Sequence, residues 1–322
     1  MSKLSNFLPG ITLALLVTVI SHQLVPFVQI GAPMLALLTG MVFSSIYLSK
    51  QSKLRMGVSF SQTKALEAAI VLLGFSISID NYSSYTAYFI SIPFVVATSL
   101  GFTYIVSRKL GVSKKQSVLL SFGNSICGSA AVATASKVIE ADAKDVGSVL
   151  PVINILGVIL LFIFPLAFAA FPYLSKDQSL FVLGSSLQSV GHVGALGGSF
   201  APELAIVALS FKMWRVLLLF PSSLALQKIY QRKSNSASSS ASNYYLWLFF
   251  AAILLTNFLH FDFYKYFVDS GKFLLTFAMG AIGLGISFKS AFKNSPKLML
   301  AGTISIVFII TANTLISVFF GH

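Results

Sequence analysis

The sequence predicts an all-α polytopic membrane protein of about eleven transmembrane helices in a single domain, residues 1–322. Of its 322 residues, 56% are hydrophobic and only 10% are charged, and the mean hydropathy is +0.86. Because a spanning helix needs about 20 apolar residues, this length holds roughly ten or eleven spans. A single cysteine excludes an internal disulfide, and we expect no cofactor and no metal site.

Hydrophobicity marks eleven candidate spans, which we number in chain order. They lie at residues 5–25, 31–49, 63–80, 84–106, 117–136, 146–172, 178–198, 202–226, 243–259, 264–288 and 296–320. The first is expected to be a retained span and not a cleaved signal peptide, because Pro9 and Gly10 lie early and no small-residue cleavage site follows.

The net charge of +13 fits the loops on one side of a bilayer better than it fits nucleic-acid binding. Four of the connections between spans are strongly basic, and all four are even-numbered. Their basic residues are Lys50, Lys53, Arg55 and Lys64, then Arg108, Lys109, Lys114 and Lys115, then Lys228, Arg232 and Lys233, and last Lys289, Lys293 and Lys297. This alternation predicts a cytoplasmic N-terminus and an external C-terminus.

Two internal offsets suggest an inverted repeat. The preferred one pairs spans 2–6 with spans 7–11, as repeats at about 31–172 and 178–322 joined by a flexible cytoplasmic linker at 228–243, and leaves span 1 extra. It sets span 5 opposite span 10. The other offset is shorter and matches the segment from Gly74 to Asp80 with the segment from Gly283 to Lys289.

Span 5 is apolar, but Gly123, Asn124, Ser125 and Gly128 weaken its helix. Since a break at membrane depth is tolerated only where the backbone faces protein or a watery cavity, this segment is predicted to line a site. A helix that restarts near Ser129 would offer free N–H groups to an anion, with Ser125 or Ser129 as its N-cap. The alternative is close helix packing through small residues.

Span 10 carries Gly280, Gly283 and Gly285, which we interpret as a second interruption. Interrupted helices at corresponding positions of inverted halves indicate a transporter site at the midplane.

Span 7 is dense in glycine, hydroxyl and amide groups, which predicts a face toward a polar cavity. Ser186, Gln188, Ser189 and His192 lie on it. His192 would carry a proton or bind an anion, or else be a neutral histidine hydrogen-bonded between helices.

Lys212 and Arg215 lie on one face of span 8 at membrane depth, where ionisable residues usually face a partner or a pathway. A cationic pair among few acids indicates an anionic substrate. In the alternative interpretation, the two residues pair with Glu67, Glu203 or helix C-termini.

Catalysis is not expected, because the sequence holds no nucleophile-elbow, metalloprotease, P-loop or paired-carboxylate motif. Glu140 and Asp142 follow span 5 and belong to a solvated loop, or else hold a coupling cation.

The chain resembles the YeiH-like sulfate exporter family over nearly its whole length. The most specific match is the run from Gly123 to Ala131, which contains Ser125-Ile126-Cys127-Gly128, and its continuation from Val138 to Asp142. Further matches are Leu72 to Phe75, Leu38 to Met41, and the segment from Lys212 to Leu218. The resemblance implies a bacterial inner-membrane carrier with two inverted five-helix repeats whose fourth helices are broken and cross, similar to bile-acid symporters and cation/proton antiporters.

Span 7 departs from that family's pattern. Where many relatives have I-H-D-V-A-Q-V, this chain has a run from Leu187 to Val193 with Gln188-Ser189 in place of the His-Asp pair and a new His192. A role of the acidic residue is therefore not carried over, and sulfate is only one candidate.

We expect a secondary transporter that moves a small anion, such as a sulfur oxyanion or sulfonate, by alternating access. A gated anion channel and a sodium-coupled organic anion symporter are the alternatives. Expected partners are membrane lipid, the anion and a coupling Na⁺ or H⁺, with no nucleic acid and with a homodimer left open. The predicted substrate-binding residues are Gly123, Asn124, Ser125, Cys127, Gly128, Ser129, Ser186, Gln188, Ser189, His192, Lys212, Arg215, Gly283 and Gly285.

Overall fold

The computed structural model describes residues 7–28, 31–44, 47, 51–76, 85–170, 173–200, 202–230, 244–259, 263–286 and 296–320. Every regular element in these ranges is helical. Six helical segments are long and apolar enough to cross a bilayer, namely Leu8–Phe27, Thr86–Lys109, Lys144–Phe168, Ile206–Ile229, Tyr264–Leu284 and Pro296–Phe320. The prediction of an all-α chain with several spans is confirmed, while the count of eleven spans and the inverted repeat stay predictions.

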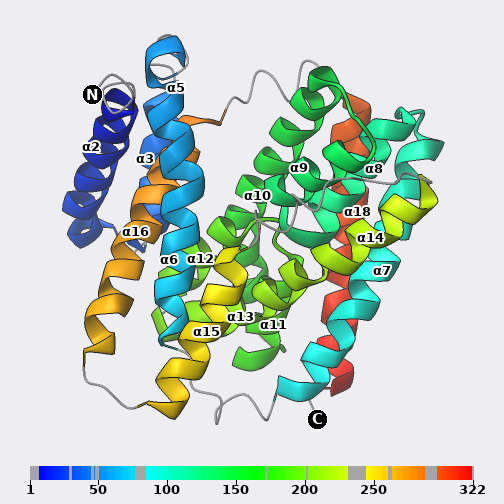
Figure 1. Cartoon of the computed structure of the whole chain (residues 1–322). Coiled ribbons are helices and arrows are strands. Elements are labelled where there is room, and N and C mark those ends of the chain that lie inside the picture. The colour runs from blue at the N-terminus through cyan, green and yellow to red at the C-terminus, as the bar shows by residue number, and fades with distance from the viewer. Residues whose placement is uncertain are drawn as a thin grey trace. The chain divides into compact units, whose positions relative to one another are not determined.

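The chain divides into two compact units that interleave in sequence (Figure 1). Unit 1 holds Met1–Ser83, Gly194–Ile206 and Ser242–Ile286, and unit 2 holds Ser84–Val193, Val207–Ala241 and Ser287–His322. Neither unit coincides with one of the predicted repeats. The predicted linker lies outside the described residues from residue 231 onward.

The helices of unit 1 are α2 (Leu8–Leu24) with the 3₁₀ turn η1 (Val25–Phe27), α3 (Ala32–Val42), α5 (Gln51–Phe60), α6 (Leu66–Gly74), α15 (Tyr244–Phe258) and α16 (Tyr264–Leu284). In unit 1, α16 packs against α2, α3, α5 and α6, and α15 packs against α6. Helices α5 and α6 are joined without a break by the π segment η2 (Ser61–Ala65). The basic connection predicted before span 3 is therefore helical from Gln51 onward. Figure 1 shows α16 beside α3 and α6, which it contacts.

Helix α16 is continuous through Gly280 and Gly283 and ends at Leu284, with Gly285 as its C-cap residue. The rest of predicted span 10, from residue 287, lies outside the described residues, so its interruption stays a prediction. The glycines within α16 serve close packing. A Cβ atom on Gly283 would lie 2.2 Å from the Leu37 carbonyl oxygen, and one on Gly40 would lie 2.3 Å from the Gly280 carbonyl oxygen. The backbones of α3 and α16 can approach this closely only without side chains, as is common in membrane helix pairs.

Unit 2 holds most of the remaining helices. They are α7 (Thr86–Lys109), α8 (Lys114–Phe122), the π segment η4 (Gly123–Cys127), α9 (Ser129–Val138), α10 (Ala143–Ala170), α11 (Lys176–Ser186), α14 (Leu219–Ile229) and α18 (Pro296–Phe320). Helices α12 (Val190–Phe200) and α13 (Pro202–Leu217) carry the chain from unit 2 into unit 1 and back. Within unit 2, α18 packs against α7, α10 and α11.

Span 5 is broken as predicted. Helix α8 widens into η4, and α9 begins at Ser129 after Gly128, which adopts φ 72° and ψ −124°. The predicted serine caps are wrong, since Gly128 is the N-cap residue and no side chain caps α9. Only glycine adopts this backbone conformation readily, which explains why the turn is made at Gly128.

The second break lies in span 7. Helix α11 ends at Ser186, Leu187 is extended with φ −61° and ψ 143°, and α12 begins at Val190. Within the residues that the structure describes, spans 5 and 7 are both discontinuous.

We expect Gly128→Ala to lower the free energy of unfolding by about 1–3 kcal/mol, because a residue with a Cβ is strained at this φ and ψ. Equilibrium unfolding in detergent micelles measures the change. Gly101→Ala is the matched control, since a Cβ there meets no atom within 4 Å and the variant should be at least as stable as the native protein. Equal stability of the two variants would contradict the conclusion that the turn at residue 128 requires glycine.

Candidate functional site

The two helix breaks lie against each other in unit 2. A Cβ atom on Gly128 would lie 3.5 Å from the Gln188 carbonyl oxygen. The Lys212 ammonium joins the breaks directly, because its Nζ donates to the Ile126 carbonyl at 2.8 Å and to the Leu187 carbonyl at 2.5 Å. One fully buried side chain thus ties η4 to the end of α11.

Arg215 makes a second bridge between the same two segments. Its Nε donates to the Ser125 carbonyl at 3.2 Å, and its Nη2 donates to the Asn124 carbonyl at 3.2 Å. A further short hydrogen bond runs from Nη2 to the Ser125 carbonyl, and one runs from Nη1 to the Ser185 carbonyl. Arg215 is fully buried and lies three residues after Lys212 on α13, so both cations leave the same helix face.

These contacts bear out one interpretation of the cationic pair, in which it binds helix C-termini, and leave its part in attracting an anion a prediction. Within the described residues, Lys212 and Arg215 bind the carbonyl ends of broken helices and form no ion pair with a carboxylate. The side chain of Glu203 lies outside the described residues.

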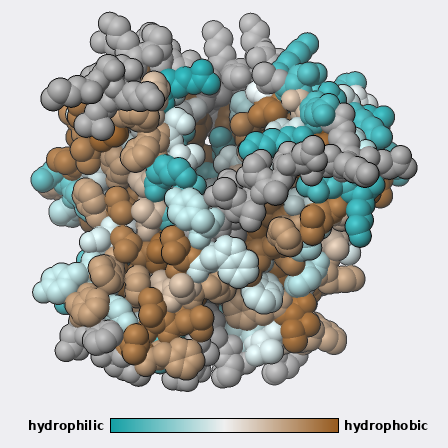
Figure 2. Space-filling view, viewed as in Figure 1, coloured by the Kyte–Doolittle hydropathy of each residue, from teal (hydrophilic) through white to brown (hydrophobic). Residues whose placement is uncertain are grey.

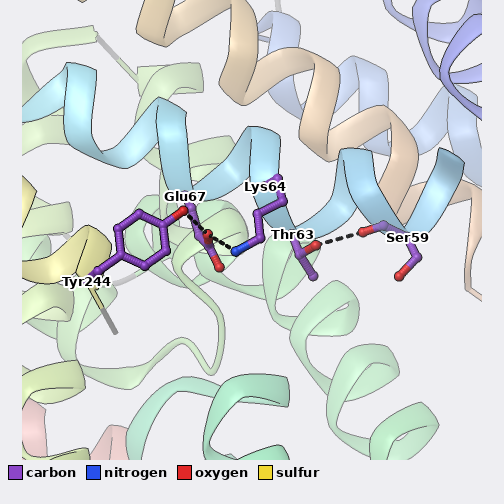
Figure 3. A network of polar contacts seen from close by, with 5 residues as sticks. All are labelled: Ser59, Thr63, Lys64, Glu67 and Tyr244. Atoms are coloured by element: carbon purple, nitrogen blue, oxygen red, sulfur yellow. Dashed lines mark hydrogen bonds and ion pairs between the residues drawn. The ribbon is translucent and has the colours of Figure 1, made fainter. Parts of the chain in front are cut away.

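Glu67 is occupied elsewhere, in unit 1. Its Oε2 accepts from Lys64 Nζ at 2.7 Å and from the Tyr244 hydroxyl at 3.0 Å (Figure 3). In the same picture, the Thr63 hydroxyl turns back to the Ser59 carbonyl, which it contacts at 2.8 Å. Glu67 thus links the π segment to the start of α15 and does not pair with Lys212 or Arg215.

The net charge at the place where the two helix breaks meet favours an anion. The two cations sit at the C-terminal ends of α8–η4 and α11 and offset the negative ends of these helices. The positive N-terminal ends of α9 and α12 remain. With Lys212 and Arg215 protonated, the balance is about two positive elementary charges, counting half a charge for each helix end.

Buried polar atoms without partners gather at the same place. Among the described residues, the side-chain atoms without a hydrogen bond include Asn124 Oδ1, Ser125 Oγ, both polar atoms of Gln188, both ring nitrogens of His192, and Asn313 Oδ1. Each of these five side chains is at most 2% exposed. A buried polar group left unpaired costs about 1–3 kcal/mol, so this concentration indicates a ligand or water site.

Two asparagines present fixed acceptor oxygens. Asn313 Nδ2 donates to the Ser185 carbonyl and the Ser186 hydroxyl, both at 3.0 Å, and Asn124 Nδ2 donates to the Gly302 carbonyl at 3.3 Å. Because the amide nitrogens are committed to acceptors, each Oδ1 is left as an acceptor without a donor.

Sequence reasoning missed Asn313 and Gly157. Asn313 lies on α18, fully buried in an apolar span, and an amide in such a segment was the available signal. Gly157 lies on α10, and a Cβ there would approach His192 Nδ1 to 2.3 Å and Gln188 Oε1 to 3.3 Å. It makes room for both side chains, a role that only the packing discloses.

The other predicted site residues of unit 2 have different environments. Gly123 packs so closely that a Cβ would lie 2.0 Å from the Ile153 Cδ1, and Cys127 is buried beside it, so both shape the break. Ser189 caps α12 by accepting from the Gly191 N–H at 3.2 Å, whereas Ser129 is exposed.

The predicted site residues Gly283 and Gly285 belong to unit 1. A Cβ on Gly285 would lie 2.5 Å from Gln62 Nε2, which donates to the Ala281 carbonyl at 2.8 Å. Both glycines therefore have packing roles inside unit 1, and their part in substrate binding stays a prediction.

Several helices long and apolar enough to span a membrane, together with two discontinuous helices that are adjacent at their breaks, define a polytopic helical membrane protein. A family model described as "Conserved hypothetical protein 698" matches residues 7–302, so the chain belongs to that family, which is the YeiH-like group indicated by the sequence motifs.

Several bacterial relatives carry the name UPF0324 membrane protein. The one from Lactiplantibacillus plantarum is 31% identical over 71% of this chain and 69% of its own length. Those from Clostridium tetani and Streptococcus pneumoniae serotype 4 are 28% and 29% identical, covering 97% and 99% of this chain and 97% and 100% of theirs. No solved structure matches the chain.

We expect Lys212→Met to destabilise the protein, because the substitution keeps the length of the side chain but leaves two buried carbonyls without a donor, at about 1–3 kcal/mol each. Unfolding in detergent micelles measures the loss. Lys272→Met is the control, since Lys272 is exposed and its ammonium lies 3.4 Å from exposed Asp269. Similar stability of both variants would show that Lys212 does not hold the breaks together.

Proposed function

We propose that the protein is a secondary transporter that binds a small anion where the breaks of spans 5 and 7 meet. The observation that carries the proposal is the set of buried, unpartnered polar atoms beside Lys212 and Arg215. A site that favours negative charge, between discontinuous helices, is the arrangement that many carriers use. Alternating access is the mechanism that we propose, in the bacterial inner membrane with the N-terminus inside.

The unpartnered donor and acceptor atoms limit which anions the site can bind. Ser125, Gln188 and His192 can donate to an oxyanion, whereas Asn124 Oδ1 and Asn313 Oδ1 accept only. A sulfur dianion that carries acceptors alone would leave these two oxygens unpaired. An anion that also bears an N–H or O–H group, or an anion that travels with Na⁺ or H⁺, would satisfy both sets.

A gated anion channel is the second candidate, because broken helices also line pores. Single-channel recording in planar bilayers separates the two candidates. Unitary currents would support the channel, and slow saturable flux without such currents would support the carrier.

Removing the unpartnered atoms should reduce flux without loss of stability. We expect Ser125→Ala and Gln188→Met to lower anion flux at least tenfold, because a loss of about 1.4 kcal/mol in binding is one factor of ten. Their stability should be unchanged or higher, since these atoms have no hydrogen bond to lose.

The measurement is uptake of radiolabelled sulfate, sulfite and a sulfonate into proteoliposomes, with and without sodium and proton gradients. Ser305→Ala is the control, because the Ser305 hydroxyl is buried but already donates to the Ala301 carbonyl at 2.7 Å. The site assignment would be refuted if both site variants transported the anion as fast as the native protein. It would also be refuted if Ser305→Ala lost as much flux as they do.

A further inference from the structure

Unit 2 contains an apolar groove that the proposed transport site does not use. It runs between α7 and α14, has a volume of about 380 Å³, and is open on one side. The lining residues are Pro93, Val96, Ala97 and Leu100 on α7, Phe122 at the end of α8, and Leu218, Pro221, Ser222, Ala225, Leu226 and Ile229 along α14. Ser222 is the only polar side chain in this lining, so a charged cargo finds no partner in the groove.

The groove lies on the bilayer-facing side of two membrane spans. Next to its lining residues, Phe94 is 68% exposed on α7 and Phe220 is 63% exposed on α14. Both helices belong to segments that are long and apolar enough to cross a bilayer. Hydrocarbon chains are therefore the surroundings of this groove.

The length of the groove matches one lipid leaflet. From Leu218 to Ile229 the lining extends about 16 Å along the helix at 1.5 Å per residue. The hydrocarbon core of a bilayer is about 30 Å thick, so one leaflet contributes about half of that length.

One end of the groove is basic. Exposed Arg108 and Lys109 lie at the C-terminal end of α7, and exposed Lys228 lies at that of α14. Lys114 Nζ lies 5.2 Å from the centre of the Tyr230 ring, which places the start of α8 at the same end. Figure 2 shows hydrophilic residues gathered over this end of unit 2, where α8 begins and α14 ends, with hydrophobic residues beyond them.

Tyr230 adds a hydrogen-bond donor next to Ile229, at the same end of α14 as the basic residues. It follows Ile229, the last lining residue, and its hydroxyl is buried without a hydrogen-bond partner among the described residues. A phosphate oxygen is an acceptor that would pair with this hydroxyl and with the ammonium of Lys114 or Lys228.

We propose that this groove is a binding site for an anionic phospholipid. One acyl chain occupies the groove between α7 and α14, and the phosphate lies between Tyr230, Lys114 and Lys228. The apolar lining and the leaflet-length groove select an acyl chain, and the basic end with its unpaired hydroxyl selects an anionic headgroup. Because Phe122 directly precedes the break at Gly123, the bound chain contacts the helix that carries the candidate transport site.

Native mass spectrometry of the purified full chain in detergent tests the proposal, with dioleoyl phosphatidylglycerol and dioleoyl phosphatidylcholine as probes. We expect the phosphatidylglycerol to bind at least tenfold more tightly. The Lys114→Gln and Lys228→Gln double variant should remove that preference, whereas Lys272→Gln, which neutralises an exposed lysine of unit 1, should keep it. Equal binding of both lipids by the native protein would overturn the proposal.

A second pair of variants separates the groove from general attraction to basic residues. Ala225→Trp fills the groove without a change of charge and should lower phosphatidylglycerol binding about tenfold. Leu224→Trp is the control, because Leu224 is not among the lining residues and is 42% exposed. Unfolding in detergent confirms that both variants are folded, and native binding by folded Ala225→Trp would overturn the groove assignment.

Discussion

The hydrogen bonds from Lys212 and Arg215 to the carbonyl ends of two broken helices are the interaction on which unit 2 depends. In an apolar setting, each freed carbonyl must find a donor inside the protein, or the break costs several kcal/mol. The two cations supply donors to Asn124, Ser125 and Ile126 on one side and to Ser185 and Leu187 on the other. A single face of α13 therefore permits both breaks and fixes them against each other.

The sequence was sufficient to predict the class of fold and the first break. Long apolar runs with few charges leave hardly any choice but membrane helices, and Gly128 marks a turn that needs positive φ. The depth and spacing of Lys212 and Arg215 predicted their importance, and helix C-termini were among the partners considered. The particular carbonyls could not be predicted, because they lie 25 to 91 residues away along the chain.

The break in span 7 was not predicted because glycine has two opposite uses in a membrane helix, and the prediction relied on glycine. In span 10, Gly280 and Gly283 lie within the continuous helix α16, where Gly280 makes room for Val17 of α2 and Gly283 for the backbone of α3. In span 7, the break is made at Leu187, Gln188 and Ser189, where polar side chains follow one another and no glycine is needed. In span 7, consecutive polar residues were thus the signal of the break, whereas Gly280 and Gly283 signal packing. The amide of Asn313 in an apolar span was a signal that the prediction did not use, and Gly157 could not be predicted because its role depends on tertiary neighbours.

The way the cations are used has a consequence for transport. Lys212 commits two of its three N–H groups to backbone carbonyls, and every nitrogen of Arg215 donates to the breaks. A positive field would then attract an anion to the place where the two breaks meet. Most of the direct contacts of that anion would come from neutral groups such as Ser125 and Gln188. Field attraction with neutral contacts favours entry without the tight ion pair that would hinder release, and a carrier needs both steps to be fast. For the proposed anion transport, fixed cations whose N–H groups mostly bind the backbone are therefore better suited than free ones would be.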